Sequence, residues 1–362
     1  MGNVEHLPIR SEKVAVLLNA NARSVSENLK RELENFVPPE DLYYSRCFDD
    51  ARQIARQVLD RGYRTVLTGG GDGTFVGYVN CLFDASEQPG PVGHGALKLV
   101  PLPAHAVRLP RVGVLKLGTG NAVADFAGAT GRRVGVVEDI LRARSGEVSQ
   151  SRTLHLLSHE GKRAPFAGLG IDAAVLNDYV RLKQSVKGTR MQFVGSGGLG
   201  YFCSVVSKTL PTYALSRGVP NVEVVNLGGP ARQVGPDGKP VGRDIEHGEI
   251  LYKGPCKMAA AGTVPNYGFG FQIFPWATRA PGRFQLRLTA ISVPTILRNL
   301  RSLWKGGTPP GGVLDFHCEK VLIRFDRDMP LQVGGDAEGY RREVVFEMSE
   351  RPLELLDFRA RG

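Results

Sequence analysis

A glycine-rich run, residues 69–74, encloses one aspartate and one threonine in the order Gly-Gly-Gly-Asp-Gly-Thr. It follows the short β-branched segment Thr65 to Thr68 and precedes the apolar segment Phe75 to Phe83, which can form a helix. Glycine permits positive φ and carries no Cβ, so the backbone N–H groups of such a turn can surround a polyphosphate. The helix that follows adds its positive N-terminal end. The run therefore predicts a phosphate-binding turn, in which Asp72 meets a metal ion or a hydroxyl of the bound nucleotide.

A second candidate turn, Gly118-Thr119-Gly120-Asn121, follows the strand-like segment Val112 to Leu117. The hydroxyl of Thr119 and the amide of Asn121 can bind phosphate oxygens or orient a metal-bound water. Alone, this turn is a weak indication, but it lies about 45 residues after the first one, at the end of the next predicted strand.

The elements before these turns alternate between strands and helices. Strands are predicted at Lys13 to Leu18 and Asp41 to Cys47, and helices at Ser26 to Glu34 and Ala51 to Arg61. Such alternation predicts a parallel sheet covered by helices, with a ligand site beyond the carboxyl ends of its strands. Residues 84–110 interrupt the order with five prolines and several glycines, and we interpret them as an insertion that forms an exposed loop.

Beyond residue 150 the pattern changes to short β-like segments separated by Gly and Pro, which indicates an antiparallel sandwich or barrel. We therefore predict a nucleotide-binding α/β domain at 10–149, a β-rich domain at 150–348, and a segment at 349–362 that packs back on the first domain. The predicted strands of the second domain include Met258 to Ala261, Phe284 to Thr289, Val321 to Phe325 and Val344 to Met348.

The composition restricts the partners. The net charge of +10 and the pI near 9.5 favour anionic partners, but no basic segment forms a recognisable nucleic-acid module, so we expect no nucleic acid. No apolar run is long enough to span a bilayer and the N-terminus lacks a signal-peptide core, which predicts a cytoplasmic protein. The five cysteines show no metal-ligand spacing. The sequence leaves the oligomeric state, including a homodimer, open.

The first turn resembles the Gly-Gly-Asp-Gly-Thr signature shared by diacylglycerol kinases, sphingosine and ceramide kinases, bacterial soluble lipid kinases and NAD kinases. The second resembles the Pro-Leu-Gly-Thr-Gly-Asn of lipid kinases, with Lys116 in place of the proline. The resemblance also implies roles for Asn19 and Ser45, which end the first two strands. The candidate nucleotide-binding residues are Asn19, Ser45, Gly69, Gly70, Gly71, Asp72, Gly73, Thr74, Gly118, Thr119 and Asn121.

Lipid kinases of this type carry Asp-Gly-Glu or Asp-Gly-Asp after an apolar run, and the first aspartate is their general base. Leu331-Gln332-Val333 anchors that motif here and places Gly334 at the position of the base. Asp336 aligns with the second acid, and we predict that it removes the proton from the acceptor hydroxyl, with Glu338 as the reserve. Asp72 completes the candidate catalytic set.

The resemblance implies an α/β domain of the NAD kinase and lipid kinase type, followed by the antiparallel domain. It implies a lipid kinase that binds ATP and Mg²⁺ in the cleft between the domains and acts on a diacylglycerol-like or sphingoid lipid. The lipid would be met at an anionic membrane surface by a peripherally associated protein. Some bacterial members hold a second magnesium through acids that residues 278–283 lack, so we predict no such metal site.

Two alternatives remain. Gly334 favours a nucleotide-binding homologue that regulates without turnover, while an NAD kinase would share the first turn but not the second turn or the Asp336 loop.

The segment Ser292 to Lys305 repeats apolar residues at helical spacing between cations. It is interpreted either as a helix packed on the sheet or as an interfacial helix on anionic lipid.

Overall fold

The structure, a computed structural model, describes residues 13–22, 24–87, 107–131, 133–185, 218–267, 270–307 and 312–360. The chain divides into two compact units. Unit 1 comprises residues 1–118, 127–153 and 353–362, and unit 2 comprises residues 119–126 and 154–352.

A six-stranded sheet forms the centre of unit 1, in the order β2-β1-β3-β4-β18-β5. Neighbouring strands among β1 to β4 are parallel, and β18 joins β4 in parallel near the end of the chain. All residues of β3 are buried and β1 is nearly so, which explains why these strands read as continuous apolar runs. The strands are β1 (Val14–Asn19), β2 (Leu42–Ser45), β3 (Thr65–Gly70), β4 (Arg111–Lys116), β5 (Ser151–Leu154) and β18 (Leu353–Leu356).

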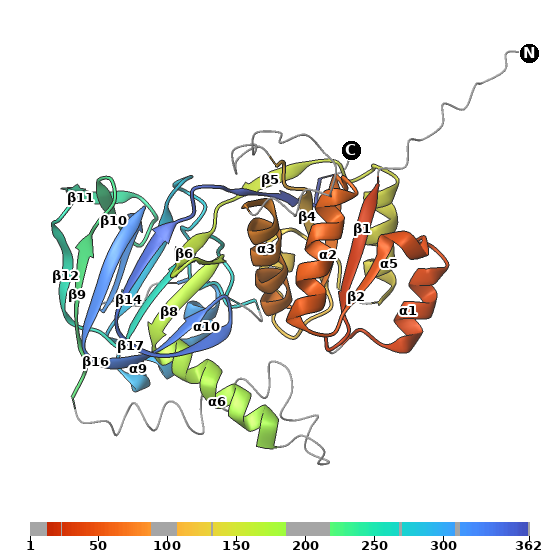
Figure 1. Ribbon diagram of the computed structural model, residues 1–362. Coiled ribbons are helices and arrows are strands. Elements are labelled where there is room, and N and C mark those ends of the chain that lie inside the picture. The colour runs from red at the N-terminus through yellow and green to blue at the C-terminus, as the bar shows by residue number, and fades with distance from the viewer. Residues whose placement is uncertain are drawn as a thin grey trace, which may run out of the picture. The chain divides into compact units, whose positions relative to one another are not determined.

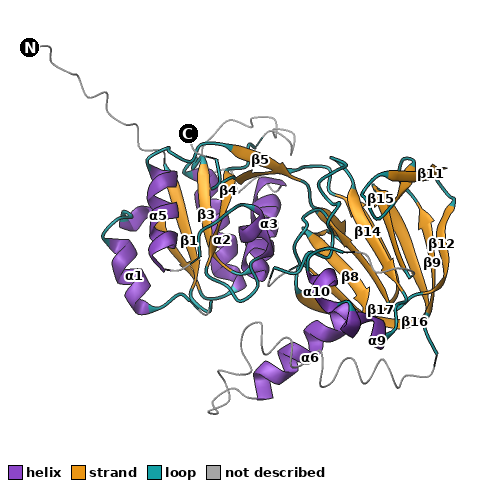
Figure 2. Ribbon diagram, turned by 180° about the vertical axis from the view of Figure 1, so that it is seen from behind, coloured by secondary structure: helices purple, strands orange, loops and turns teal. Residues whose placement is uncertain are grey.

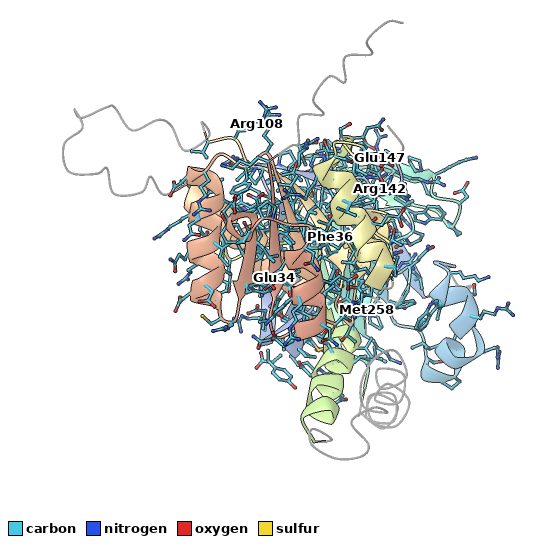
Figure 3. The ribbon with its side chains drawn as sticks, turned by 90° about the vertical axis from the view of Figure 1, so that its right-hand side faces the viewer. Glu34, Phe36, Arg108, Arg142, Glu147 and Met258 are labelled. Carbon is cyan, nitrogen blue, oxygen red and sulfur yellow. The ribbon has the colours of Figure 1, made fainter. Side chains whose placement is uncertain are left out.

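Helices cover both faces of this sheet (Figures 1 and 2). Helix α3 is apolar around most of its circumference, because its first half follows β3 into the core and buries residues such as Phe75 and Tyr78. The end of α5 is held by an ion pair from Arg142 Nε to Glu147 Oε1 at 3.0 Å (Figure 3). The helices are α1 (Glu27–Glu34), α2 (Phe48–Asp60), α3 (Asp72–Glu87) and α5 (Arg133–Arg144), with the short α4 (Ala122–Phe126) grouped with unit 2.

Unit 2 consists mainly of a 12-stranded sheet whose described pairings are antiparallel, with the long hairpin β16–β17 at its centre. Strand β16 pairs with β9 along its first half and with β8 along its second half, so it belongs to both parts of the sheet. The strands are β6 (Leu157–His159), β7 (Lys162–Ala164), β8 (Phe166–Gly170), β9 (Asn221–Asn226), β10 (Ala231–Val234), β11 (Pro240–Ile245), β12 (Ile250–Pro255), β13 (Met258–Gly262), β14 (Phe284–Thr289), β15 (Val313–Cys318), β16 (Lys320–Val333) and β17 (Asp336–Met348). The predicted fold class, α/β followed by antiparallel β, is confirmed.

Within the described residues of unit 2, the helices that accompany this sheet include α6 (Ile171–Ser185), α9 (Val293–Arg298) and α10 (Leu300–Trp304). The segment predicted as one helix, 292–305, is therefore two helices separated at Asn299. No helix in the described residues is long and apolar enough to cross a membrane.

The boundaries of the units differ from those predicted at three places. The change of unit comes after Thr153 rather than near residue 150, and residues 119–126 of the second candidate turn group with unit 2. The C-terminal segment that groups with unit 1, which includes β18, begins at residue 353 rather than at residue 349. Of the predicted insertion at 84–110, residues 84–87 continue α3 and residues 107–110 lead into β4, while 88–106 lie outside the described residues.

Candidate active site

Four strand ends meet at one edge of the sheet in unit 1. The register pairs Asn19 with Ser45, Leu18 with Gly69 and Gly70 with Lys116. Because parallel strands share their direction, their carboxyl ends and the following loops lie side by side. The sequence segments chosen for their chemistry in unit 1 are thereby brought to the same edge.

The glycine-rich run is not one extended turn. Gly69 and Gly70 belong to β3, Asp72 and Gly73 belong to α3, and Gly71 alone connects the two elements. None of these glycines has positive φ, so the turn does not use the left-handed conformation that glycine permits. Their small size matters instead: a Cβ on Gly70 would lie 2.3 Å from Thr74 Oγ1. Glycine is required because the backbone approaches its neighbours closely.

Gly118 approaches its neighbours more closely than Gly69 or Gly70 does. A Cβ on this residue would lie 2.1 Å from the Cα of Gly71 and 2.4 Å from its backbone nitrogen. The main chains of the two candidate turns are therefore in contact at Gly71 and Gly118. The first turn of α3 lies directly after this contact, where backbone N–H groups have no partner inside the helix. These N–H groups are suited to a phosphate.

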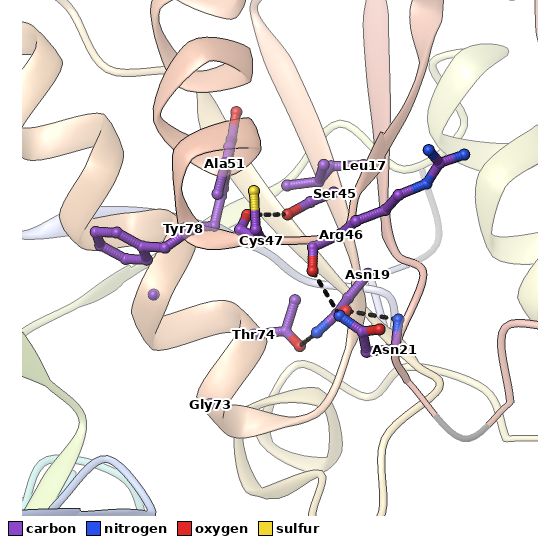
Figure 4. Close-up of a pocket in the computed structure, with 12 residues that line it drawn as sticks. Leu17, Asn19, Asn21, Ser45, Arg46, Cys47, Ala51, Gly73, Thr74 and Tyr78 are labelled. Atoms are coloured by element: carbon purple, nitrogen blue, oxygen red, sulfur yellow. Dashed lines mark hydrogen bonds between the residues drawn. The ribbon is translucent and has the colours of Figure 1, made fainter.

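Asn19 connects β1 to the first turn of α3. Its amide Nδ2 donates to Thr74 Oγ1 at 2.8 Å, and its Oδ1 accepts from the backbone N–H of Asn21 at 2.9 Å. Asn21 Nδ2 in turn donates to the carbonyl of Arg46 at 2.7 Å (Figure 4). Three loop ends are thus tied together by side-chain amides. The position of Thr74, which carries a hydroxyl toward the strand ends, is set by this network.

A cavity of about 240 Å³ opens beside this network. It brings together Asn19, Ser45, Gly73 and Thr74 from the predicted set. Asp72, 8% exposed, starts α3 and does not line the cavity, and neither do Gly69, Gly70, Gly71 and Gly118. The other residues of the lining, which are not in the predicted set, are Leu17, Asn21, Arg46, Cys47, Phe48, Ala51, Gly77 and Tyr78.

Two of the unpredicted residues have useful chemistry. The side chain of Arg46 is exposed and has no carboxylate at ion-pair distance in the part of the chain that the structure describes. Phe48 is 49% exposed, with the Arg52 guanidinium 4.6 Å from its ring centroid. Arg46 could have been selected from the sequence, because it is a cation next to the end of a predicted strand. Phe48 could not, because no sequence pattern distinguishes an exposed aromatic residue at the start of a helix as a binding residue.

Thr119 and Asn121 follow Gly118 and belong to unit 2. The carbonyl of Asn121 accepts from the backbone N–H of Asp125 at 2.8 Å, so Asn121 lies immediately before the first residue of the short helix α4. Within the described residues, no three His, Cys, Asp or Glu side chains lie close enough together to form a metal site.

The candidate base lies in unit 2, on the tight turn between β16 and β17. Gly334 and Gly335 have φ of 63° and 87°, which is the combination that a two-residue type I′ hairpin turn requires. Asp336 and Glu338 follow the turn, and both accept from Lys162 Nζ, at 3.1 and 2.5 Å respectively. Asp336 is the more accessible acid, with 53% of its side chain exposed against 35% for Glu338.

Lys162 stays charged between these two acids. Burial, the largest single influence, lowers the pKa of its ammonium group, but the hydrogen bonds and charges of Glu338 and Asp336 together raise that pKa above its ordinary value. The ammonium group therefore orients both carboxylates of the turn.

A buried polar chain supports the same turn from below. Gln332 Oε1 accepts from the backbone N–H of Gly335 at 2.9 Å, and its Nε2 donates to the hydroxyl of Tyr267. Tyr267 Oη donates to Asp172 Oδ2 at 2.6 Å. The other oxygen of Asp172, Oδ1, is buried without a hydrogen-bond partner among the described residues. The buried side chain of Gln332, which is 1% exposed, thus connects Asp172, through Tyr267, to the turn that precedes Asp336.

Burial raises the pKa of Asp172, although hydrogen bonds from Tyr267 and Gln332 oppose this effect. The folded protein then binds a proton more tightly than the unfolded chain, so the free energy of unfolding falls as the pH rises above the unfolded pKa near 4. We expect Asp172→Asn to flatten this dependence and to raise the stability of the variant relative to the parent at neutral pH. Urea unfolding between pH 4 and pH 8 measures both. A parent whose stability rises across this range to the same extent as the variant's would contradict the prediction.

Comparison with known proteins agrees with this geometry. Residues 13–152 match the family model of the diacylglycerol kinase catalytic domain. The predicted resemblance to diacylglycerol kinases is confirmed. This match includes β1 to β4 and both candidate turns, but not the hairpin that carries Asp336.

Solved structures resemble the chain over almost its whole length. The crystal structure of a diacylglycerol kinase from Bacillus anthracis str. Sterne is 13% identical, with a TM-score of 0.57, over 97% of this chain and 98% of that one. A second structure from the same organism, assigned as a diacylglycerol kinase, is 15% identical, with a TM-score of 0.59, over 97% of this chain and 99% of that one. At this identity the likeness shows the shared fold. No curated protein matches the sequence.

Proposed function

We propose that this protein is an ATP- and Mg²⁺-dependent lipid kinase that phosphorylates the hydroxyl of a diacylglycerol-like or sphingoid lipid. The observation that carries the proposal is the match of residues 13–152 to the diacylglycerol kinase catalytic domain, which includes the strand ends around the cavity. The neighbouring solved structures share the fold of both units and support the same class.

The residues present fit a nucleotide. Gly71 and Gly118 approach each other closely and carry no side chains that could cover the start of α3, which suits a polyphosphate site at this helix N-terminus. In the proposal, the N–H groups of this first turn and the hydroxyl of Thr74 bind phosphate oxygens, and Arg46 compensates their charge. Mg²⁺, when bound to the phosphates of ATP, neutralises the charge that develops during transfer.

The acceptor step needs only one proton transfer by the protein. In the proposal, the carboxylate of Asp336 takes the proton of the lipid hydroxyl, the hydroxyl oxygen forms a bond to the γ-phosphorus, and the bond between that phosphorus and the β–γ bridging oxygen breaks to release ADP. Positioning and charge compensation account for most of the acceleration of such a transfer. Lys162 then has two roles, to orient Asp336 and to balance its charge.

The second candidate function is a nucleotide-binding homologue without turnover. It is favoured by Gly334, which stands where kinases of this type have their first acid. Gly334 lies in a well-formed two-residue hairpin turn, but it carries no carboxylate. An NAD kinase is a weaker candidate, because the Gly118 turn and the Asp336 hairpin resemble those of lipid kinases.

ADP release from ATP and Mg²⁺ in mixed micelles tests these functions against one another. The panel contains diacylglycerol, sphingosine, ceramide and other long-chain alcohols, with NAD as a separate acceptor and ATP affinity measured by calorimetry. ADP release that depends on one lipid class supports the proposal. ATP binding without release in any lipid supports the second function, and release that depends on NAD alone supports an NAD kinase.

If the cavity binds the base of the nucleotide, Phe48 is placed to stack on that base, and its substitution tests this assignment. We expect Phe48→Ala to weaken ATP binding roughly tenfold, because an aromatic ring stacked on a base contributes about 1–3 kcal/mol. Calorimetry with ATP and with inorganic triphosphate measures the effect, and triphosphate affinity should not change because it has no base. Phe36→Ala is the matched control, since Phe36 is 45% exposed on the same unit and does not line the cavity. Equal losses for ATP and triphosphate would exclude stacking on Phe48.

A further inference from the structure

The helices α9 and α10 of unit 2, with the residue that follows them, carry three exposed cations within one short segment. Residues 250–314 contain eight Lys and Arg and no Asp or Glu. Three of the eight, Arg298, Arg301 and Lys305, lie within one short segment and are exposed. No carboxylate is at ion-pair distance from any of them within the described ranges of the chain.

Exposed cations on the sheet of the same unit are arranged differently. Many of them pair with a carboxylate, as in Arg243 with Glu249 at 2.7 Å and Lys253 with Glu223 at 2.7 Å. Arg324 likewise pairs with Glu343 at 2.5 Å. The sheet surface is therefore close to neutral, whereas the α9–α10 segment presents uncompensated positive charge. An uncompensated cluster attracts an anionic surface at a distance set by the ionic strength.

Apolar side chains lie among these cations. Ile296, Leu303 and Trp304 are each half-buried. Trp304 packs one side of its ring against Phe271, with 5.5 Å between the ring centroids, and its carbonyl accepts from the backbone N–H of Gln272 at 3.1 Å. The segment is thus fixed to the unit by its backbone and part of the tryptophan, while the rest of these side chains stays accessible.

We propose that the α9–α10 segment, residues 292–305, is the surface through which this protein binds an anionic lipid bilayer. Cations attract the headgroup phosphates, and tryptophan and aliphatic side chains enter the boundary between headgroups and acyl chains. A nucleic acid would use the cations but would leave Ile296 and Leu303 without a partner. The proposal rests on the proposed lipid kinase function for the choice of a bilayer, and it identifies where the protein meets its substrate's membrane.

Binding to vesicles is measured without ATP, by tryptophan emission. The chain has two tryptophans, Trp276 and Trp304. Trp276→Phe leaves Trp304 as the reporter, and phosphatidylglycerol vesicles should shift its emission to shorter wavelength while phosphatidylcholine vesicles should not. Brominated acyl chains should quench the same emission. Absence of both effects with anionic vesicles would overturn the proposal.

Substitution of the three cations gives the decisive comparison. Because each basic residue near an anionic surface contributes about fivefold to the binding constant, R298Q/R301Q/K305Q should lose on the order of a hundredfold in affinity for phosphatidylglycerol vesicles. The matched control R56Q/R64Q/R108Q removes three exposed cations of unit 1, each without a carboxylate at ion-pair distance in the described chain, and should stay within about threefold of the parent. Equal losses in both variants, or no loss in either, would overturn the proposal.

Two further measurements separate this proposal from its alternatives. Binding of single-stranded RNA more tightly than vesicles, with loss in the α9–α10 variant, would assign the surface to nucleic acid and overturn the proposal. Kinase activity in neutral detergent micelles should be the same for the parent and for R298Q/R301Q/K305Q, because no anionic surface is present. A parent that binds vesicles but releases no ADP with any lipid would contradict the proposed function alone.

Discussion

Asp336→Asn should lower kcat for lipid phosphorylation by about 10²- to 10⁴-fold, which is the usual range for the loss of a general base. Asparagine keeps the size of the side chain and its hydrogen-bonding oxygen toward Lys162, but it cannot take a proton. KM for ATP should remain within about threefold of the parent, because phosphate binding is assigned to the strand ends of unit 1. ADP release under saturating ATP and lipid gives both parameters.

Glu338→Gln is the matched control for this prediction. Glu338 also accepts from Lys162 and lies two residues away on the same strand, yet its side chain is less exposed. We expect its replacement to lower kcat less than tenfold. Full activity in Asp336→Asn together with a large loss in Glu338→Gln would transfer the role of the base to Glu338.

The double variant Gly334→Asp, Asp336→Asn examines the place of the base more directly. Gly334 has φ of 63°, a conformation that aspartate accepts at the first position of a type I′ turn. Recovery of activity in this variant would show that the position is competent and that Asp336 replaces a missing acid. No recovery would show that the acceptor hydroxyl meets this chain at Asp336 only.

Gly118→Ala should remove most ATP binding and lower the free energy of unfolding. The new methyl group would lie 2.1 Å from the Cα of Gly71, and backbone atoms cannot move aside as the end of a flexible side chain can. Overpacking of this kind costs about 1–3 kcal/mol, and the two turns must separate to relieve it. We expect the affinity for ATP, measured by calorimetry, to fall more than tenfold.

Gly131→Ala is its control, because a Cβ at Gly131 would lie 3.6 Å from the Lys116 side chain, an ordinary contact distance. Urea unfolding of both variants separates loss of fold from loss of the site. If Gly118→Ala binds ATP as tightly as Gly131→Ala, the contact between the two turns is not required for nucleotide binding.

The α/β part of the fold could be predicted because its local signals agree. The apolar run at Lys13 to Leu18 became β1, displaced by one residue, and the predicted strand Phe284 to Thr289 became β14 with the same bounds. Long strands of the hairpin were missed. Val321 to Phe325 and Val344 to Met348 are only parts of β16 and β17, whose remaining residues include exposed charges such as Arg327 and Arg342. Such residues belong to the strands because they pair with the neighbouring strand, and this pairing cannot be predicted from the local sequence pattern.

The candidate site was predictable to the extent that backbone geometry demands particular residues. Glycine at position 118 was selected because a glycine-rich turn follows a predicted strand, and asparagine at position 19 because of the resemblance to lipid kinases. The structure explains both, since Gly118 lies against the main chain of Gly71 and Asn19 connects β1 to α3. The wall of the cavity formed by Phe48 and Tyr78 could not, because it arises when α2 and α3 pack together. The buried chain from Asp172 to Gln332 joins residues 160 positions apart and depends on the pairing of β8 with β16.

The strand β18 lies between β4 and β5, although about 200 residues separate it from β5 in the sequence. During synthesis, the last strand of this sheet is therefore made only after all residues of unit 2. Until then β4 and β5 lack the neighbour between them, and backbone groups on the facing edges have no partner. In nascent unit 1 the strands β2, β1, β3 and β4 can pair with one another, but the sheet stays incomplete between β4 and β5 until β18 has been made. The sheet that supports the nucleotide site is thus completed only after synthesis has passed residue 356, so we expect the nascent protein to reach its full nucleotide affinity as one of its last properties.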